Sequence, residues 1–457
     1  MTTRRLHCLR VCTAAAALIA ATSPGLADTH LLFPLGEGPF SWDSYEAFVA
    51  EHDFSGQVLT VTGASTGEDK TKLENLFAYF EEATGADVRF TGSESFEQDI
   101  VIAVQAGSPP NVAMFPQPGL AQDLAARGAL VPLDEETRQW FEESFAAGSS
   151  WADLASFEGP DGEERIYGIF FGTDVKSLVW YSPDAFDEMG YEVPETMEEL
   201  KALTDQIVAD GGTPWCIGLG SAAATGWPAT DWVEDMMLRT QPPEVYDRWV
   251  TNEMPFDDPA VIRAIEEYGY FARNDEYVAG GAEGVATTDF RDSPDGLFEF
   301  PPECYMHKQA SFIPNFFPED VEVGVDADFF YFPAYERQDL GKPILGSGGL
   351  NAIASDAPVA RAFLEFLKTP FAHEIAIAQG QFLTPHLEAN PEAYATDTQR
   401  SLGDILTSAT TFRFDGSDLM PGEIGTSAFW TAMVDYTTGT SAEEAARSVQ
   451  QRWDTIK

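Results

Sequence analysis

The residue types that carry out most enzymatic chemistry are present in this sequence, but not in the spacings that the chemistry needs. The segment nearest to a phosphate-binding loop, residues 63–72, has Glu68 and Asp69 where that loop requires glycine and lysine. His373 and Glu374 begin a zinc-binding pattern whose second histidine is missing, and the chain has only six histidines. We therefore expect neither a metal nor a cofactor.

The acidic residues give only a weak argument for catalysis. With 75 Asp and Glu residues, many pairs of carboxylates could reach the separation of roughly 5 to 10 Å that glycosidases use, so such a pair has no specificity here. An exported carbohydrate-active enzyme that uses two of these acids remains an alternative hypothesis.

Aromatic residues beside polar ones in two predicted loops indicate a different chemistry, the recognition of sugars. The two segments are Gly226-Trp227-Pro228-Ala229-Thr230-Asp231-Trp232 and Ser427-Ala428-Phe429-Trp430. Sugar rings have flat C–H faces that pack on aromatic rings, and their hydroxyls bond to carboxylates, amides or lysine. A single tryptophan is more often a core residue, but several of them in loops rich in Gly, Pro and Asp favour a sugar site.

The elements that must position these loops show an alternation of strands and helices. The predicted strands are residues 56–63, 87–90 and 111–115, and the predicted helices are residues 69–84 and a segment that follows Ser95. Gly85 is expected to end the first helix, and Ser95 is expected to cap the second in a capping box with Gln98. The alternation predicts an α/β fold with an open, mostly parallel sheet covered by helices.

In such a sheet a ligand lies beyond the carboxyl ends of the strands. The loops at residues 63–67, 91–95 and 115–118 are therefore the first candidates for a binding site. Further elements are predicted at residues 178–181 (a strand) and at residues 197–208, 259–272, 359–367, 370–379 and 442–453 (helices). Ser441 and Glu444 predict a second capping box at the start of the last helix.

The charge balance excludes two classes of partner. The chain has 457 residues, with 26 Lys and Arg against 75 Asp and Glu, and a formal net charge of −49. Nucleic acids and anionic membranes repel such a surface, so we expect neither as a partner. The hydrophobic fraction of 44% is enough for a folded chain, and the length predicts two or three domains.

The first 27 residues differ from the rest and predict an export signal. Arg4, Arg5 and Arg10 precede an apolar stretch, residues 11–21, which has about half of the roughly 20 residues that a membrane span needs. Small residues precede a cleavage point after Ala27. We expect a signal peptide over residues 1–27 and a mature protein that is free in the periplasm. Its loss removes three basic residues and changes the formal charge from −49 to −52.

Two cysteines belong to the mature chain, Cys216 and Cys304, because Cys8 and Cys12 lie in the signal. An oxidising compartment favours a disulfide between them. Two buried free thiols are the alternative, because the sequence does not give the distance between the two residues.

Three further regions form a recognisable set. They are Ile166-Tyr167-Gly168-Ile169 with Leu178-Val179-Trp180-Tyr181-Ser182-Pro183-Asp184-Ala185-Phe186, Gly190-Tyr191 and Val193-Pro194-Glu195-Thr196-Met197-Glu198-Glu199-Leu200; Gly346-Ser347-Gly348-Gly349 with Ala362-Phe363-Leu364-Glu365-Phe366-Leu367; and Ser427-Ala428-Phe429-Trp430 before the last helix. The set resembles the extracellular solute-binding proteins of the maltodextrin-binding type. With Gly226-Trp227-Pro228 and the paired cysteines, it is similar to the α-glucoside-binding branch, the periplasmic components of importers for sucrose, maltose and trehalose.

The resemblance implies a type II periplasmic binding protein fold, in which two discontinuous α/β lobes are joined by hinge strands and close on a ligand between them. The lobes would be residues 28–172 with 350–384, and residues 173–349 with 385–457. It also implies a non-catalytic receptor that binds an α-glucoside as a monomer and delivers it to the membrane subunits of an ABC permease.

The resemblance also implies ligand contacts. Trp430 takes the place of the tryptophan that stacks on a sugar ring in maltodextrin binders, and Ser65 and Thr66 lie in the loop that supplies polar contacts. Gln117 lies in the third such loop, which lacks the aspartate and arginine common there in maltodextrin binders. That difference favours a shorter glucoside than maltodextrin.

Further contacts are expected from the rest of the chain. Trp227 and Asp231 are assigned as an aromatic plate and a hydroxyl acceptor of the second lobe, with a helix start capped by Asp231 as the alternative. Lys176 beside the hinge is a candidate hydroxyl donor, with an ordinary surface lysine as the alternative. The remaining candidates are Gly349, Asn351, Glu94 and Phe382.

Two matters stay open at this point. The same fold could carry another solute, such as glucosylglycerol or a polyol. Because a neutral sugar does not need charge in its binding site, we expect the acidic residues on the outer surfaces, with a few such as Asp231 turned inward.

Overall fold

The computed structural model describes residues 31–145, 148–336, 339–380, 382–408 and 411–456, so the predicted signal peptide lies outside the described residues. The strands are β1 (Val58–Gly63), β2 (Asp87–Gly92), β3 (Val112–Phe115), β4 (Ser156–Glu158), β5 (Glu164–Ile166), β6 (Gly168–Val175), β7 (Leu178–Tyr181), β8 (His307–Lys308), β9 (Asp328–Tyr331), β10 (Pro343–Ile353) and β11 (Thr411–Phe414).

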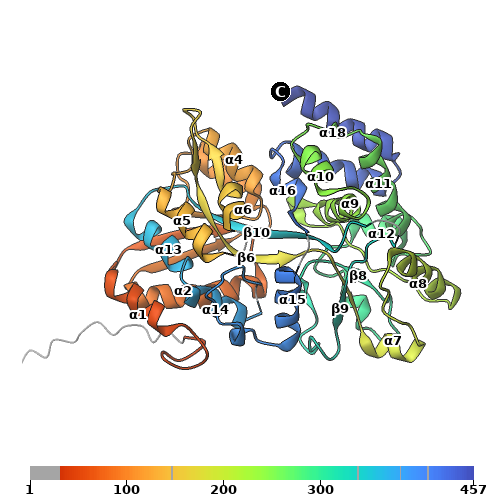
Figure 1. The fold of residues 1–457 in the computed structure, drawn as a ribbon, viewed down its shortest axis with the longest axis horizontal. Helices are drawn as coiled ribbons and strands as arrows, with labels where there is room; N and C mark the ends of the chain where they lie inside the picture. The colour runs from red at the N-terminus through yellow and green to blue at the C-terminus, as the bar shows by residue number, and fades with distance from the viewer. Residues whose placement is uncertain (1–30, 146–147, 337–338, 381, 409–410, 457) are drawn as a thin grey trace, which may run out of the picture. The chain divides into compact units, whose positions relative to one another are not determined.

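The helices connect these strands and are shown with them in Figure 1. The α-helices are α1 (Trp42–Glu51), α2 (Gly67–Thr84), α3 (Phe96–Gln105), α4 (Pro118–Ala126), α5 (Glu135–Ser144), α6 (Gly148–Leu154), α7 (Pro183–Met189), α8 (Met197–Ala209), α9 (Trp227–Thr240), α10 (Pro243–Val250), α11 (Pro259–Ala272), α12 (Gly281–Thr287), α13 (Pro358–Leu367), α14 (Pro370–Ala378), α15 (Asp397–Ser408), α16 (Gly416–Leu419), α17 (Trp430–Thr437) and α18 (Ala442–Ile456). The short helices are η1 (Ala222–Ala224), η2 (Asp295–Leu297), η3 (Ile313–Phe316), η4 (Pro391–Ala393) and η5 (Ile424–Phe429), the last being a π-helix.

The largest sheet among the described residues contains the three strands predicted in the first part of the chain. Its order is β11-β10-β3-β1-β2, and β6 pairs with β10. β1 runs parallel to β2 and β3, as predicted, whereas β10 runs antiparallel to β3 and β6 and makes the sheet mixed. The carboxyl ends of β1, β2 and β3 therefore lie at one edge of the sheet.

The helix ends agree with the sequence in one place and differ in two others. Gly85 ends α2 with φ +71° and donates its N–H to the Glu81 carbonyl. The capping box predicted for Ser95 is wrong: its backbone (φ −114°, ψ 29°) is not extended, and its side chain makes no capping bond. At α18 the Glu444 N–H does donate to the Ser441 hydroxyl at 3.2 Å, but the Glu444 carboxylate accepts from that hydroxyl instead of the backbone.

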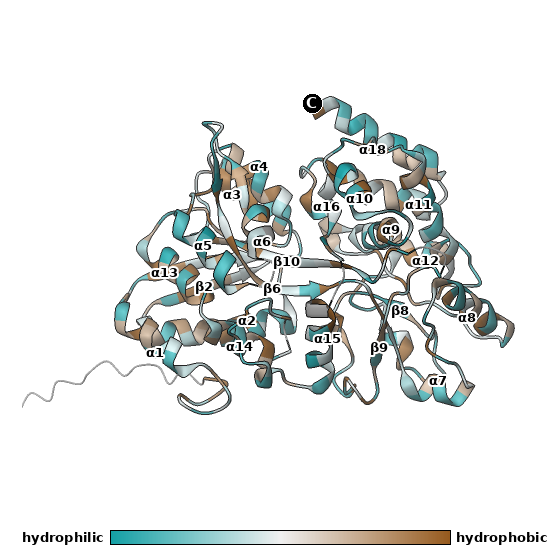
Figure 2. Cartoon of the chain, viewed as in Figure 1, coloured by the Kyte–Doolittle hydropathy of each residue, from teal (hydrophilic) through white to brown (hydrophobic). Residues whose placement is uncertain are grey.

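The buried side chains form three cores. The first core contains side chains of residues 45–171 and 350–376, and Phe414. The second core contains many of the buried side chains of residues 179–332 and 420–453, and Leu345. The third core is smaller and consists of Val175, Leu178, Trp180, Cys216, Phe290, Leu297, Cys304, Ile313, Ile344, Leu383 and Leu402. Figure 2 shows both hydrophilic and hydrophobic residues along helices such as α8 and α18, as expected of helices with one packed face.

Two strands pass from one core to another. β6 contributes Phe171 to the first core and Val175 to the third, and β10 contributes Leu345 to the second and Leu350 to the first. Every residue of β6 is buried, a pattern typical of strands covered on both faces. These strands occupy the positions predicted for hinges; the exact division into lobes stays a prediction.

The predicted disulfide is present and connects Cys216 to Cys304, with Cα atoms 5.5 Å apart. Within the described ranges, no helix combines the length and the apolar character that crossing a bilayer requires.

Candidate functional site

A cavity of about 250 Å³ lies beyond the carboxyl ends of β1, β2 and β3. Its lining also includes residues of β6, β10, α9, η3 and α16, so chain segments from the whole described sequence meet there. The cavity therefore joins residues of the first core, such as Phe115 and Phe171, with residues of the third core, such as Phe290.

Nine of the eleven predicted contact residues line this cavity: Ser65, Thr66, Glu94, Gln117, Lys176, Trp227, Gly349, Phe382 and Trp430. Asp231 and Asn351 do not. Asn351 lies on β10, fully buried, with its amide Nδ2 3.4 Å from the carbonyl oxygens of Ile169 and Gly349. Its contacts are with the two crossing strands and not with the cavity.

The loop after β1 places Ser65 and Thr66 at the cavity. This loop passes close to Gly92, the last residue of β2, which has no side chain to obstruct it. A Cβ on Gly92, at the end of β2, would lie 1.8 Å from the Ser65 carbonyl oxygen, so only glycine fits there. Gln117 in the third loop is 5% exposed, and its amide donates to the Glu97 carboxylate at 2.8 Å. Glu97 itself lines the cavity and was not predicted.

Trp430 begins α17 directly after the π-helix η5, a type of helix often found at functional sites. The approach of α9 to this residue depends on Gly226, which precedes α9 with φ +114°. A Cβ on Gly226 would lie 2.4 Å from the Trp430 carbonyl oxygen. Trp430 also borders a second, neighbouring cavity, which shares Glu97 with the first.

Trp227 and Phe382 supply further aromatic surface. The Trp227 ring meets Phe290 edge-on at 4.9 Å between centroids, and the Lys176 ammonium lies 5.2 Å from the centroid of Trp227. Phe382 packs against β6 at Gly172, where a Cβ would lie 2.5 Å from the Phe382 ring. Both rings therefore line the cavity and also pack against neighbouring residues, Trp227 against Phe290 and Phe382 against Gly172.

Lys176, directly after β6, is a buried cation and not an ordinary surface lysine. It is 5% exposed, and its ammonium bonds to Asp231 at 2.9 Å and to Asp415. Burial alone would lower the pKa of Lys176, but the surrounding carboxylates outweigh that effect and raise the pKa well above its ordinary value. Asp231 lies inside α9 and does not cap the helix, whose N-cap is Gly226. Its carboxylate bonds to the Lys176 ammonium instead.

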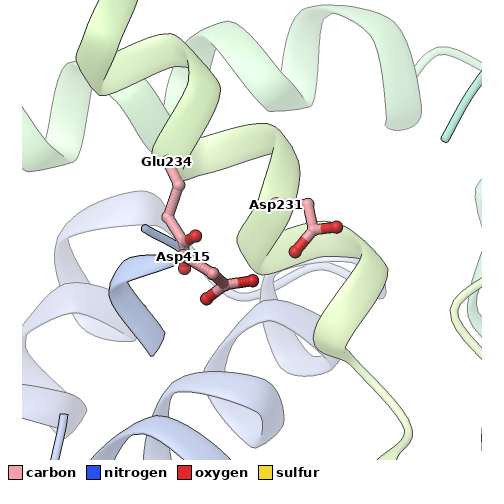
Figure 3. A group of neighbouring side chains, drawn as sticks. All are labelled: Asp231, Glu234 and Asp415. Carbon is pink, nitrogen blue, oxygen red and sulfur yellow. The ribbon is translucent and has the colours of Figure 1, made fainter. Parts of the chain in front are cut away.

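Figure 3 shows Asp231 and Glu234 on α9 with Asp415 opposite them. The three residues each offer one carboxylate oxygen within 4.8 Å of the others, an arrangement that could hold a cation. The Lys176 ammonium already bonds to two of the three, so it takes the place that a metal ion would have. Glu234 also accepts the backbone N–H groups of Gly416 and Ser417, at 3.0 and 2.9 Å.

A few acidic residues face the cavity, although Asp231, the one expected there, does not line it. Six acidic residues line the cavity, Asp69, Glu94, Glu97, Asp174, Asp415 and Asp418, against two cations, Lys176 and Arg291. Arg291 lies 3.8 Å from Glu94 and 3.3 Å from Asp289. These acids come from α2, α3, β6, α16 and the segments directly before α3 and α16.

Burial and crowding change the ionisation of these acids. Burial raises the pKa of Asp174 to about 7, although the Ser311 hydroxyl that donates to it opposes the rise. Burial also raises the pKa of Asp231 to about 8 against the effect of Lys176. For Asp415 burial acts in the same direction, but Lys176 outweighs it and holds the pKa at about 2.

Comparisons with known proteins show the family of this chain. The chain matches the family described as bacterial extracellular solute-binding protein over residues 63–373. It is 58% identical over 449 residues to the alpha-glucosides-binding periplasmic protein AglE of Rhizobium meliloti (strain 1021), covering 97% of this chain and 98% of that one. The chain belongs to the bacterial extracellular solute-binding proteins.

Two further proteins are similar to this solute-binding protein, one in sequence and one in structure. It is 41% identical over 396 residues to the osmoprotective compounds-binding protein GgtB of Synechocystis sp., covering 86% of this chain and 92% of that one. Its structure is similar to that of the bacterial solute receptor AcbH, with a TM-score of 0.75, 19% identity, and coverage of 88% of this chain and 100% of that chain. The likeness confirms the predicted two-lobed type II fold.

Several lining residues of the solute-binding protein were missed by sequence reasoning. Asp415 and Asp418 follow the short strand β11, in the segment Phe412-Arg413-Phe414-Asp415-Gly416-Ser417-Asp418. A strand that ends in an acid and a glycine is the signal that could have found them. For Asp174 and Glu97 the sequence offers no such signal.

One further pattern bears on the enzyme hypothesis. Residues 63–67, Gly63-Ala64-Ser65-Thr66-Gly67, match the Gly-x-Ser-x-Gly pattern of serine hydrolases and lie between β1 and α2, the strand-to-helix context that the pattern requires. Activation of such a serine needs a neighbouring base. No histidine lines the cavity within the described residues, so Ser65 lacks the partner of that mechanism there.

Proposed function

We propose that this protein is the periplasmic substrate-binding component of an ABC importer and that it captures an α-glucoside of the sucrose, maltose and trehalose class. The observation that carries the proposal is the cavity, in which aromatic side chains and polar groups meet in a chain that is 58% identical to AglE. The rings of Trp430, Trp227 and Phe382 offer surfaces for the C–H faces of a sugar. Ser65, Gln117 and Lys176 offer hydrogen bonds for its hydroxyls.

The mechanism we propose is closure of the two lobes on the sugar, with β6 and β10 as the hinge. The closed, monomeric receptor then delivers its ligand to the membrane subunits of the permease without changing it chemically. Selectivity follows from the polar lining, because a buried polar group left unpaired by the wrong sugar costs about 1 to 3 kcal/mol.

Isothermal titration of the mature chain, residues 28–457, with sucrose, maltose and trehalose tests this proposal. We expect heat from one site and unchanged sugar after long incubation. Release of monosaccharides would instead support the exported carbohydrate-active enzyme. Absence of heat with all three sugars would contradict α-glucoside binding.

A second cargo is favoured by one observation, the 41% identity to a protein named for osmoprotective compounds. The same titration should therefore include glucosylglycerol and a polyol. If one of them binds and the disaccharides do not, the fold and the site hold while the substrate class changes.

A further inference from the structure

Asp418 is a cavity residue whose carboxyl group has no partner in the described part of the chain. It lies on α16, is 8% exposed and lines the cavity. Its backbone N–H donates to Asp415 at 3.0 Å. Its carboxyl oxygens make no hydrogen bond or ion pair with any described residue, although this side chain is more than nine-tenths buried.

The surroundings of Asp418 contain more acids than bases. Asp231, Glu234, Asp415 and Asp418 surround a single ammonium, that of Lys176, which bonds to Asp231 and Asp415. The next cations, Lys308 and Arg239, both bond to Asp235, at 2.8 and 2.6 Å. Lys308 also lies 3.5 Å from the Asp231 carbonyl oxygen and lowers the pKa of Asp231, but neither cation pairs with Asp418.

Four buried carboxylates beside one cation cannot all be charged without a large cost, so the group retains protons. Asp415 keeps its negative charge, since it bonds to Lys176 and accepts from the Ser417 hydroxyl and the Asp418 N–H. Asp418 has no such donors. Burial raises the pKa of Asp418 well above its ordinary value, and the charge of Asp415 raises it further.

The charges that act on Asp418 are those of Asp415, Asp231 and Glu97, which raise its pKa, and that of Lys176, which lowers it. The elements packed against α16 carry further charged groups: Glu234 on α9, Asp123 on α4, Glu423 before η5, Asp247 and Arg248 on α10, and Arg413 on β11. Arg413 is paired with Asp247 at 2.6 Å, and Glu423 with Arg452. The nearby carboxylates therefore dominate, and Lys176 alone opposes them strongly.

We propose that Asp418 is a ligand-binding residue that acts as a neutral carboxylic acid and donates a hydrogen bond to the ring oxygen or the glycosidic oxygen of the bound glucoside. Sugar hydroxyls both donate and accept, but these two oxygens only accept, so an ionised carboxylate cannot bond to them. The other charged or amide side chains of the lining each bond to at least one carboxylate, whereas the carboxyl group of Asp418 bonds to none. They are Lys176 with Asp231 and Asp415, Arg291 with Asp289, Gln117 with Glu97, and Asn315 with Asp69.

The test compares Asp418→Asn with Asp418→Ala in titrations with maltose, sucrose and trehalose at about pH 6. An asparagine keeps a carbonyl and replaces the acid O–H by an N–H donor, so we expect it to bind within about threefold of the wild type. The alanine variant loses the hydrogen bond, and we expect it to bind about tenfold more weakly. Asp397→Asn, whose side chain is 95% exposed, is the matched control, and thermal unfolding confirms that each variant is folded.

Two outcomes would overturn the proposal. If Asp418→Asn weakens binding as much as Asp418→Ala, the site needs a carboxylate; if Asp418→Ala binds like the wild type, Asp418 does not contact the ligand. The proposal rests on the proposed function, so a second measurement separates the two. Infrared spectroscopy of the unliganded protein should show the carbonyl band of a protonated carboxylic acid that disappears in Asp418→Asn, whether or not any sugar binds; its absence also contradicts the proposal.

Discussion

Trp430 is the side chain on which the stacking assignment depends. It lines the cavity from the start of α17 and is 4% exposed. We predict that Trp430→Ala weakens the binding of an α-glucoside by about 2 kcal/mol, or about 30-fold, because it removes the aromatic face without removing any charge. Titration calorimetry measures the change.

The matched control is Trp140→Phe on α5, outside the cavity lining, which should leave affinity unchanged. Trp430→Phe keeps an aromatic face and should fall between the wild type and the alanine variant. Equal affinity of Trp430→Ala and the wild type would refute the stacking assignment.

Asp174 gives a prediction about pH. Its pKa is about 7 in the folded protein and about 4 in an unfolded chain. The native carboxyl therefore holds its proton more tightly, so its contribution to stability is complete below about pH 4 and is lost as the pH rises toward about 7. We predict that Asp174→Asn, which stays neutral, is more stable than the wild type at about pH 8 by up to about 4 kcal/mol.

Urea unfolding of both proteins at about pH 4 and about pH 8 measures this difference. The gap between them should be smaller at the lower pH, where the wild-type carboxyl is also neutral. A gap that does not change with pH would contradict the assignment of a raised pKa to Asp174.

Sequence reasoning named Trp227, Phe382 and Trp430 among the aromatic residues that line the cavity. Of the six acids that line it, sequence reasoning named Glu94 alone. Trp227 stands between Gly226 and Pro228, and Trp430 ends the recognisable segment Ser427-Ala428-Phe429-Trp430, so their types and context were informative. Asp174 and Asp418 are two among 75 acidic residues, and only their burial beside Lys176 distinguishes them. Asp231 was predicted to contact the ligand because it is an acid next to Trp232, whereas in the structure its carboxylate bonds to the Lys176 ammonium.

At the scale of elements, Gly226 controls how closely α9 approaches α17. We predict that Gly226→Ala destabilises the protein by about 1 to 3 kcal/mol and weakens sugar binding, because a Cβ would meet the Trp430 carbonyl and the backbone at φ +114° suits glycine. Thermal unfolding and titration measure the two effects.

Gly439→Ala is the matched control. Gly439 has a similar positive φ of +133° but no atom within 4 Å of an added Cβ. It should lower stability through backbone strain alone and leave affinity unchanged. If both variants bind sugar equally well, the contact between α9 and Trp430 does not position the site.

One helix with strong local signals was predictable to the residue. α11 spans Pro259–Ala272 as predicted, since Asp258 caps it by accepting the Ala260 N–H and proline fixes its first turn. The failure at Ser95 has a local cause that the capping pattern does not include: the Ser93 hydroxyl accepts the Ser95 N–H, and the Ser95 backbone lies outside the capping conformation. The antiparallel pairing of β10 with β3 and β6 could not be predicted from the sequence either, because the direction of a strand in a sheet depends on residues that are distant along the chain.

At the scale of the whole molecule, the Cys216–Cys304 disulfide restrains 88 residues of the unfolded chain. We predict that the double variant Cys216→Ser, Cys304→Ser loses about 4 to 5 kcal/mol of unfolding free energy, because the unfolded state regains that freedom. Chemical denaturation of the oxidised wild type and the variant measures the loss. Equal stability of the two would show that the bond does not restrain unfolding.

The position of this disulfide along the chain has a consequence for the timing of assembly. A polypeptide threaded through a membrane from its N-terminus delivers Cys304 to the oxidising side while residues 305–457 are still to follow. Those residues include β10, α16 and Trp430, without which the cavity has no second wall. The disulfide can therefore form before the cavity is complete. A receptor exported in this order would acquire its disulfide before it can bind a ligand.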